Sequence, residues 1–172
     1  MNNINVLIDA ETIQNKVEEL ANQISNDYNN EEIILVCILK GSVYFATDLS
    51  LKIKNNTVIL DFMKVSSYGS GTETTGKLNF KLDLSEDIEN KNVIIVEDII
   101  DSGITLHYLH ELLSKRNTKS LKICTLLDKP ERRIKDVKID YTGFQVENKF
   151  VVGYGMDYNE KYRNLPYISY ID

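Results

Sequence analysis

Three carboxylates stand close together in the sequence at the end of an apolar run. In VIIVEDIIDSGIT, residues 93–105, Glu97 and Asp98 directly follow Val-Ile-Ile-Val, and Asp101 precedes a Ser-Gly turn. An ionised group that leaves water needs a partner. Successive residues of a strand point to opposite faces, so Glu97 and Asp98 cannot both be ordinary surface charges on a sheet that is covered on both faces. The pattern therefore predicts a ligand at this strand end.

The turn after these carboxylates indicates what the ligand is. Asp101 to Thr105 would form a tight turn that opens a helix continuing through Leu113, and the free N–H groups of a helix start favour a phosphate. The hydroxyls of Ser102 and Thr105 could add donors. The upstream carboxylates suit the hydroxyls of a sugar, or a Mg²⁺ ion, which takes oxygen ligands. Sugar, metal and phosphate together indicate a phosphoribosyl group, whereas the simpler alternative is a plain turn in which Asp or Ser caps the helix.

Alternating helical and strand patterns place this motif in a sheet. Apolar residues recur at helical spacing over residues 10–27, with Asp9 as the expected N-cap. Short, nearly continuous apolar runs, typical of strands covered on both faces, occupy residues 33–39, 57–65, 92–98 and 121–128. Helical patterns follow the first and third runs. This alternation predicts an α/β fold with a mostly parallel sheet, flanked by helices and joined by right-handed crossovers.

Two segments depart from the alternation. Residues 66–79, SSYGSGTETTGKLN, are polar, glycine-rich and too long for a plain connection, so we expect a mobile loop. The region from about residue 139 is rich in aromatic residues and short extended pieces. We expect it to pack beside the sheet, together with the N-terminus, as a small subdomain.

Length and charge narrow the class of protein. With 172 residues the chain fits one domain, and its net charge of −6 argues against broad binding to nucleic acid or to an anionic membrane. Cys37 and Cys124 each lie inside an apolar run, where a thiol usually acts as a small buried hydrophobe. The N-terminal residues lack the segments of a signal peptide, and no apolar run approaches the roughly 18 residues of a membrane span. We therefore expect a cytoplasmic protein.

The motif at residues 93–105 resembles the phosphoribosyl diphosphate signature of the type I phosphoribosyltransferases, and its Glu-Asp-Ile-Ile-Asp core is similar to the hypoxanthine-guanine branch. Further blocks resemble that branch in order and spacing: LKGS (39–42), SSYGSGT (66–72), LLDKPERR (126–133) and KFVVGYGMDYNEKYRNLPYI (149–168). The resemblance implies a single phosphoribosyltransferase domain over residues 1–172, with a Rossmann-like sheet and a small hood formed by about residues 1–10 and 145–172. One departure is Ile104, where many relatives place Arg or Lys, but its backbone N–H should serve equally.

The reaction that the resemblance implies transfers the ribose 5-phosphate of 5-phosphoribosyl 1-diphosphate to N9 of a 6-oxopurine. The expected acceptors are hypoxanthine and also guanine, in purine salvage. Mg²⁺ would hold the diphosphate. Glu97 and Asp98 would bind the ribose hydroxyls and contact the metal, with Asp157 as a further metal contact. Asp101 would exchange a proton with purine N7 as general acid or base. The turn after Asp101 would cradle the 5-phosphate through Ser102, Gly103, Ile104 and Thr105.

Two later blocks would contact the base. The resemblance implies that Lys129, which follows a strand, donates to the exocyclic O6 and so favours oxopurines over aminopurines. Phe150 would stack on the purine face, while the Val151 backbone reads the base edge. Without the resemblance, Lys129 is an ordinary solvated charge, and residues 149–152 are a short strand with core residues.

Further implied contacts concern the diphosphate. Arg163 would hold it with its planar guanidinium. Lys40 and Gly41 would do so through backbone N–H groups, which a cis peptide between Leu39 and Lys40 turns toward the ligand. Without the resemblance, these residues fit a surface ion pair and a turn with a helix cap.

The glycine-rich loop also gains a role from the resemblance. Ser67 and Tyr68 would close over the bound diphosphate and exclude water during the transfer. The alternative is a flexible hairpin tip with no role in the reaction.

Two other classes of function stay open. Some proteins with this fold are regulators that bind nucleotides and RNA, but the net charge of −6 and the lack of a long Lys/Arg cluster speak against RNA binding. A sister enzyme that prefers xanthine is harder to separate, because xanthine shares O6 with hypoxanthine, whereas the donor at Lys129 disfavours adenine. Family members are usually dimers or tetramers, so we expect a homodimer or homotetramer, with no nucleic acid or membrane partner.

Overall fold

The apolar runs of the sequence form a six-stranded sheet with the order β4-β3-β2-β5-β6-β7. The computed structural model describes residues 4–67 and 78–171. The strands of this sheet are β2 (Ile33–Ile38), β3 (Val58–Ser67), β4 (Leu78–Leu82), β5 (Asn92–Ile100), β6 (Ser120–Asp128) and β7 (Tyr141–Gln145). All neighbouring strands run parallel except β3 and β4, which are antiparallel. The predicted mostly parallel sheet is therefore confirmed.

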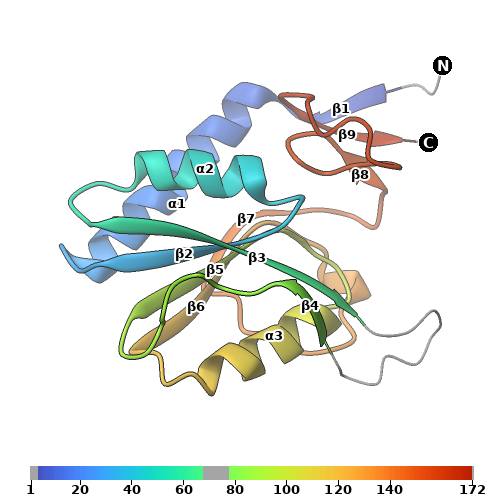
Figure 1. Cartoon of the computed structure of the whole chain (residues 1–172). Helices are drawn as coiled ribbons and strands as arrows, with labels where there is room; N and C mark the ends of the chain where they lie inside the picture. The colour runs from blue at the N-terminus through green and yellow to red at the C-terminus, as the bar shows by residue number, and fades with distance from the viewer. Residues whose placement is uncertain (1–3, 68–77, 172) are drawn as a thin grey trace.

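Helices cover both faces of this sheet, as the continuous apolar runs predicted. The helices are α1 (Ala10–Tyr28), α2 (Val43–Lys52) and α3 (Ile104–Ser114). Figure 1 shows α1 and α2 on one face and α3 on the other. In β5, Ile94 and Val96 belong to the core that α1 and α2 cover, whereas Val93 and Ile95 belong to the core that α3 covers. Each residue of the apolar run 93–96 therefore meets an apolar layer, which explains the missing polar alternation.

The first helix lies close to its predicted bounds, residues 10–27. The side chain of Asp9 accepts a hydrogen bond from Thr12 N at 2.7 Å and caps the helix as expected. The stripe that predicted the helix is also the face that it buries, namely Ile13, Val17, Leu20 and Ile24. Within the described part of the chain, no helix is both long and apolar enough to cross a membrane.

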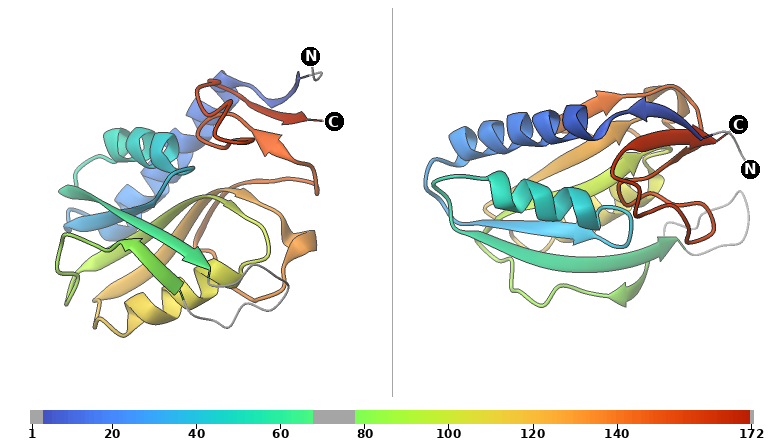
Figure 2. Two further views of the ribbon diagram at one scale, coloured as in Figure 1. Left: turned by 45° about the vertical axis from the view of Figure 1, so that its right-hand side comes forward. Right: turned by 90° about the horizontal axis from the view of Figure 1, so that it is seen from above.

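A second, three-stranded sheet brings together segments from near both ends of the described chain. β1 (Ile4–Ile8) pairs antiparallel with β9 (Ile168–Ile171), and β9 pairs antiparallel with β8 (Val151–Val152). We call it the hood sheet. Figures 1 and 2 place it on the side of the molecule toward which β3 points. Because ligands of open parallel sheets bind beyond the carboxyl ends of the strands, the hood sheet lies where it can cover a bound molecule.

One segment of the C-terminal region lies elsewhere than expected. YTGFQV was expected in the part beside the sheet, but residues 141–145 form β7 and pair parallel with β6 inside the main sheet. Gly143 lets the two strands approach so closely that a Cβ at this position would overlap the carbonyl oxygen of Leu126. A glycine inside a short run weakens the pattern of a strand, and this hid β7 in the sequence.

The glycine-rich segment also differs from its expected bounds. β3 extends through Ser67 and β4 begins at Leu78, and the two strands pair antiparallel. The predicted loop 66–79 therefore contributes residues at both of its ends to strands. Residues 68–77 lie outside the described residues.

Candidate active site

Strand alternation continues into the charged end of β5 and separates its two carboxylates. Glu97 falls on the same face as Ile95 and lines a pocket at the start of α3. Asp98 falls on the same face as Val96 and lines a second pocket beside the hood sheet. Both carboxylates are partly buried, so neither is an ordinary surface charge. We call these two cavities the loop pocket and the hood pocket.

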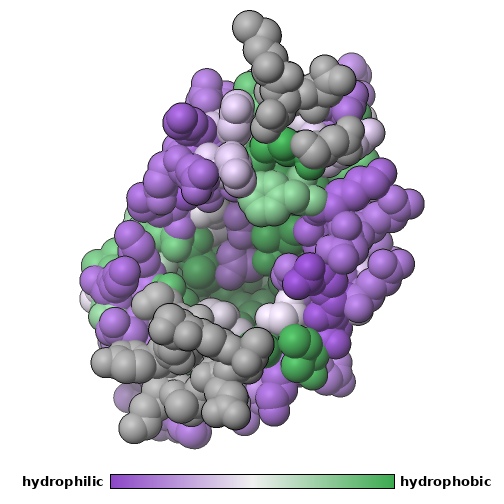
Figure 3. Space-filling view, turned by 90° about the vertical axis from the view of Figure 1, so that its right-hand side faces the viewer, coloured by the Kyte–Doolittle hydropathy of each residue, from purple (hydrophilic) through white to green (hydrophobic). Residues whose placement is uncertain are grey.

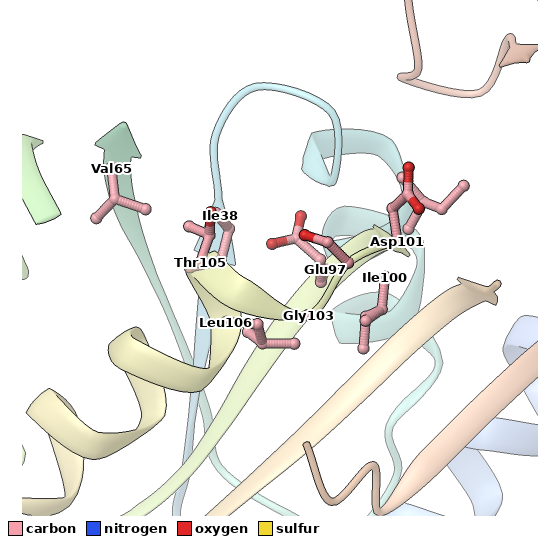
Figure 4. Close-up of a pocket in the computed structure, with 10 residues that line it drawn as sticks. Ile38, Val65, Glu97, Ile100, Asp101, Gly103, Thr105 and Leu106 are labelled. Atoms are coloured by element: carbon pink, nitrogen blue, oxygen red, sulfur yellow. The ribbon is translucent and has the colours of Figure 1, made fainter. Parts of the chain in front are cut away.

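The loop pocket has a volume of about 270 Å³ and lies at the N-terminal end of α3 (Figure 4). Its lining residues are Ile38, Val65, Glu97, Ile99, Ile100, Asp101, Ser102, Gly103, Thr105 and Leu106. Helix α3 begins at Ile104, and the first N–H groups of a helix have no partner within it. The pocket therefore combines backbone donors, the hydroxyls of Ser102 and Thr105, and the carboxylate of Glu97, as the phosphate and sugar hypothesis requires.

The turn before α3 is held in place by the chain that follows β6. Ser102 O accepts hydrogen bonds from Ile134 N at 2.9 Å and from Lys135 N at 3.0 Å. Gly103 has a φ of +75°, and a Cβ there would lie 2.6 Å from Lys135 O. Glycine alone adopts this left-handed conformation without a steric cost. The shape of the turn is thus fixed by the protein itself.

The two carboxylates at the end of β5 are costly to ionise. Burial raises the pKa of Glu97 well above its ordinary value, and the charge of Asp98 raises it further. Burial also raises the pKa of Asp98, although its hydrogen bonding with Glu97 and the charge of Arg163 oppose the rise. Gly41 closes this region so tightly that a Cβ there would overlap the Asp98 carboxylate. Such a pair favours a cation or the hydroxyl donors of a ligand.

The hood pocket has a volume of about 230 Å³ and gathers residues from separate parts of the chain. Its lining residues are Asp98, Ile99, Asp101, Lys129, Phe150, Val151, Met156 and Asp157. The residues predicted to contact a base are all among them. Figure 3 looks onto this side of the molecule, where the surface is hollowed and hydrophobic residues line the bottom of the hollow. Ile99 and Met156 were not predicted, because an apolar residue in an apolar run carries no distinguishing signal.

Lys129 is the buried cation of the hood pocket. It is 7% exposed, and its Nζ donates to Lys149 O at 2.6 Å. Burial lowers the pKa of Lys129, so it is not the ordinary solvated charge of the simpler interpretation. Phe150 is 53% exposed and packs edge-on against Tyr158, with ring centroids 5.6 Å apart. An exposed ring beside a cation with further donors fits a flat, polar heterocycle.

Asp101 lines both pockets and lies beside two arginines. Arg132 Nε lies 2.8 Å from Asp101 Oδ1, but among the described residues this oxygen accepts no hydrogen bond. Arg133 Nε donates to Asp101 O at 3.2 Å and its guanidinium pairs with Asp128. Neither arginine was assigned a role from the sequence, although both stand in the LLDKPERR block. In the structure, Asp101 is thus ion-paired with Arg132, and a ligand that binds this carboxylate competes with that arginine.

An ion-pair cluster links the β2–α2 loop to the chain after β8. The peptide between Leu39 and Lys40 is cis, as predicted. Arg163 Nη2 lies 2.8 Å from Asp157 Oδ1 and 3.2 Å from Glu160 Oε2. Lys40 Nζ lies 2.9 Å from the same oxygen of Glu160, and hydrogen bonding to Lys40 lowers the pKa of that carboxyl. Glu160 was not predicted, because a contact between residues 120 positions apart leaves no local signal.

The proposed metal ligands do not all meet. In the described ranges, no three His, Cys, Asp or Glu side chains gather closely enough to hold a metal ion. Asp157 pairs with Arg163 instead of joining Glu97 and Asp98. Mg²⁺ usually binds one or two carboxylates together with substrate phosphates. The Glu97–Asp98 pair, which resists ionisation without a cation, fits that mode, whereas a cage of three carboxylates does not.

The two residues predicted to close over the diphosphate stand where the described chain is interrupted. Ser67 is the final residue of β3, and Tyr68 lies outside the described residues. Their closing role stays a prediction.

Comparison with known proteins gives a consistent result. The family model described as "Phosphoribosyl transferase domain" matches residues 7–159. A hypoxanthine-guanine phosphoribosyltransferase of Staphylococcus epidermidis is 51% identical over 165 residues, which cover 96% of this chain and 92% of that protein. Its Mycobacterium tuberculosis counterpart is 47% identical over 173 residues, which cover 97% of this chain and 85% of that protein.

Solved structures agree with these sequence matches. The crystal structure of a Bacillus anthracis hypoxanthine-guanine phosphoribosyltransferase, with a HEPES molecule in its active site, superposes with a TM-score of 0.94 at 52% identity and covers 100% of both chains. A Trypanosoma cruzi hypoxanthine phosphoribosyl transferase superposes with a TM-score of 0.93 at 37% identity, covering 98% of this chain and 91% of that one. The likeness therefore extends over the pockets on both sides of β5.

Proposed function

The chain belongs to the phosphoribosyl transferase domain family, in its hypoxanthine-guanine branch, and from this premise we propose that it transfers ribose 5-phosphate from 5-phosphoribosyl 1-diphosphate to N9 of hypoxanthine. Guanine is the second acceptor, and the products are IMP or GMP and diphosphate, as in purine salvage. The observation that carries the proposal is the hood pocket, where Asp101, Lys129 and Phe150 surround a cavity next to the turn that opens α3.

The phosphoribosyl group fits along the end of β5. The first N–H groups of α3, with the hydroxyls of Ser102 and Thr105, bind the 5-phosphate in the loop pocket. Glu97 and Asp98 accept hydrogen bonds from the ribose hydroxyls and would hold Mg²⁺. The ion would supply positive charge that neutralises the diphosphate. Ionised carboxylates beside the ribose also stabilise the positive charge that develops on the sugar ring.

The base fits the hood pocket. The exposed ring of Phe150 stacks on the purine, while the Val151 backbone contacts the base edge. Lys129 Nζ, which already donates to Lys149 O, has further N–H donors for the exocyclic O6. An adenine amino group at that position would meet a donor with a donor, so a 6-oxopurine is favoured.

Proton transfer falls to Asp101. Its carboxylate lies in the wall that the two pockets share, and thus between the sites assigned to the phosphate and to the base. As N9 attacks C1 of the ribose and the bond to diphosphate breaks, Asp101 exchanges a proton with N7 of the purine. Arg132, whose Nε lies 2.8 Å from Asp101 Oδ1, holds this carboxylate in place before the base binds.

The diphosphate fits the ion-pair cluster. Arg163 presents its planar guanidinium, and the backbone at Lys40 and Gly41 supplies further donors. We also propose that the protein acts in the cytoplasm as a single domain and assembles as a homodimer or homotetramer, which light scattering on the purified protein would test.

A direct assay tests the function. The protein is incubated with 5-phosphoribosyl 1-diphosphate and Mg²⁺ and with hypoxanthine, guanine, xanthine or adenine, and nucleotide formation is followed by absorbance. We expect product with hypoxanthine and guanine and none with adenine. Product with xanthine as the preferred base would identify a sister enzyme, and no product with any base would contradict the proposal.

A further inference from the structure

Glu160 lies between the side-chain cations of Lys40 and Arg163, two residues that the proposed function places at the diphosphate. Its Oε2 accepts hydrogen bonds from Lys40 Nζ at 2.9 Å and from Arg163 Nη2 at 3.2 Å. Lys40 belongs to the loop after β2, and Arg163 to the segment between β8 and β9. One carboxylate oxygen thus joins the two segments that would hold the diphosphate.

The backbone directs Glu160 to this position at a steric cost. Asn159 and Glu160 have φ values of +51° and +63°, in the left-handed region that residues with a Cβ rarely adopt. Glu160 N donates to Asp157 Oδ2 at 2.7 Å, which holds the turn. A residue in such a conformation next to a binding site motivates a functional hypothesis. Here the conformation aims a carboxylate at Lys40 and Arg163.

Arg163 retains donor capacity that the protein does not use. Nη1 donates to Gly155 O at 2.7 Å, and Nη2 serves Asp157 and Glu160. Its Nε is buried and, among the described residues, has no hydrogen-bond partner. Buried N–H donors in native proteins nearly always have a partner. This unused donor points to an anionic ligand that carries more acceptors than one carboxylate.

The ion pair between Glu160 and Lys40 is exchangeable because both side chains are exposed. The side chain of Glu160 is 65% exposed and that of Lys40 is 49% exposed. Ion pairs in contact with water contribute little to stability, and a diphosphate offers both more charge and more acceptor atoms than a carboxylate. We propose that Glu160 is a built-in competitor, which holds Lys40 and Arg163 in the ligand-free protein and is displaced when a diphosphate binds.

This role rests on the proposed function and adds a consequence to it. Glu160 weakens the binding of the diphosphate substrate and equally that of the diphosphate product, because both require the same cations. Its return to Lys40 and Arg163 therefore promotes release of the product. Glu160 is in this sense a positioning residue and not a catalytic one, since it leaves the cations when the substrate arrives.

The test is equilibrium binding of inorganic diphosphate with Mg²⁺, measured by titration calorimetry. Glu160→Gln keeps the size and one acceptor oxygen but removes the charge, and we expect binding to tighten about three- to tenfold. Glu18→Gln is the matched control, because Glu18 is also an exposed carboxylate paired with a lysine, Lys54, but on α1. Its affinity for diphosphate should equal that of the unmodified protein. Equal or weaker binding by Glu160→Gln would overturn the inference.

A second variant separates displacement from a general charge effect. In a Lys40→Met background, Glu160→Gln should give a smaller gain, because one of the two cations that it releases is absent. An undiminished gain would mean that Glu160 acts through long-range charge, and would refute the competition. The transferase assay is evaluated separately. Tighter diphosphate binding by Glu160→Gln without nucleotide formation would support the competition by Glu160 and contradict the proposed enzymatic function. Nucleotide formation without tighter diphosphate binding would support the enzymatic function and contradict the competition.

Discussion

The loop pocket and the hood pocket flank the same strand end but are built in different ways. All lining residues of the loop pocket except Ile38 and Val65 come from residues 97–106. The hood pocket draws on the end of β5, on Lys129 after β6 and on residues 150–157 near the hood sheet. The functional groups of a pocket built from one contiguous segment can be recognised in the local sequence. Those of a pocket built from distant segments depend on how the fold brings these segments together.

The two pockets also use different kinds of groups. The loop pocket relies on backbone N–H groups and hydroxyls at a helix start, whose position the glycine turn fixes. The hood pocket relies on side chains, of which Lys129 is buried and Phe150 is half exposed. Substitutions should therefore damage the loop pocket through the backbone, and the hood pocket through the loss of single functional groups.

The largest effect is expected at Asp101, the carboxylate residue that lines both pockets. Asp101→Asn keeps the size of the side chain but cannot exchange the N7 proton, so kcat should fall by about 10²- to 10⁴-fold. The measurement is steady-state nucleotide formation, with thermal unfolding to verify the fold. Asp87→Asn, an exposed carboxylate elsewhere on the chain, is the control. Near-normal turnover of Asp101→Asn would remove it from the chemical step.

A change confined to the hood pocket should affect the base alone. Lys129→Met removes the donor to O6 while keeping most of the apolar stem, and kcat/KM for hypoxanthine should fall by about 10- to 100-fold, as for the loss of a hydrogen bond from a charged group. Binding of inorganic diphosphate, measured by calorimetry, should stay unchanged. A matching loss of diphosphate affinity would show that the two pockets do not act separately.

A change confined to the loop pocket should act on folding as well as on binding. Gly103→Ala places a Cβ at φ +75° and 2.6 Å from Lys135 O, so the free energy of unfolding should fall by about 1–3 kcal/mol. Denaturant unfolding measures this loss. Ser102→Ala, at a residue whose conformation needs no glycine, should cost less. Equal stability of Gly103→Ala and the unmodified protein would show that the turn adapts, contrary to the fixed shape described above.

The smallest expected effect concerns Glu97 and depends on pH. Its pKa in the folded protein is raised above the usual 4.5, so between 4.5 and the raised value the unfolded chain releases a proton that the folded chain retains. Stability therefore falls as pH rises through this window. Glu97→Gln has no carboxyl to ionise and so does not lose stability in this window. At pH 8 its Tm should be higher than that of the unmodified protein, by roughly 2–4 °C for each kcal/mol of unfolding free energy recovered. The gain should vanish at pH 4, and a gain that persists there would point to another cause.

The contrast between the pockets also explains what could be predicted from the sequence. The turn at Asp101 to Thr105 and the burial of Glu97 and Asp98 followed from strand alternation and from the properties of helix starts. Asp9 as a helix cap followed from local chemistry in the same way. These features depend on neighbours within a few residues, which the sequence displays directly.

Long-range partners had no such signal. Lys129, Phe150, Val151 and Asp157 of the hood pocket were identified only through the family resemblance, and Arg132 and Glu160 were missed altogether. Their partners, Asp101 and Lys40, are distant in sequence, and charged residues in polar segments normally remain in water. The strand β7 was missed for the opposite reason, because Gly143 concealed a close strand contact.

The hood sheet has a consequence for how the protein is made. β9 is its middle strand, and β1 and β8 each pair with β9 and not with each other. Residues 168–171 leave the ribosome after every residue that lines either pocket. A growing chain can therefore shape its phosphate turn while β8, beside which the base binds, still lacks its neighbouring strand. The pairing of β8 with β9 therefore depends on the residues that are synthesised last among those of the hood sheet.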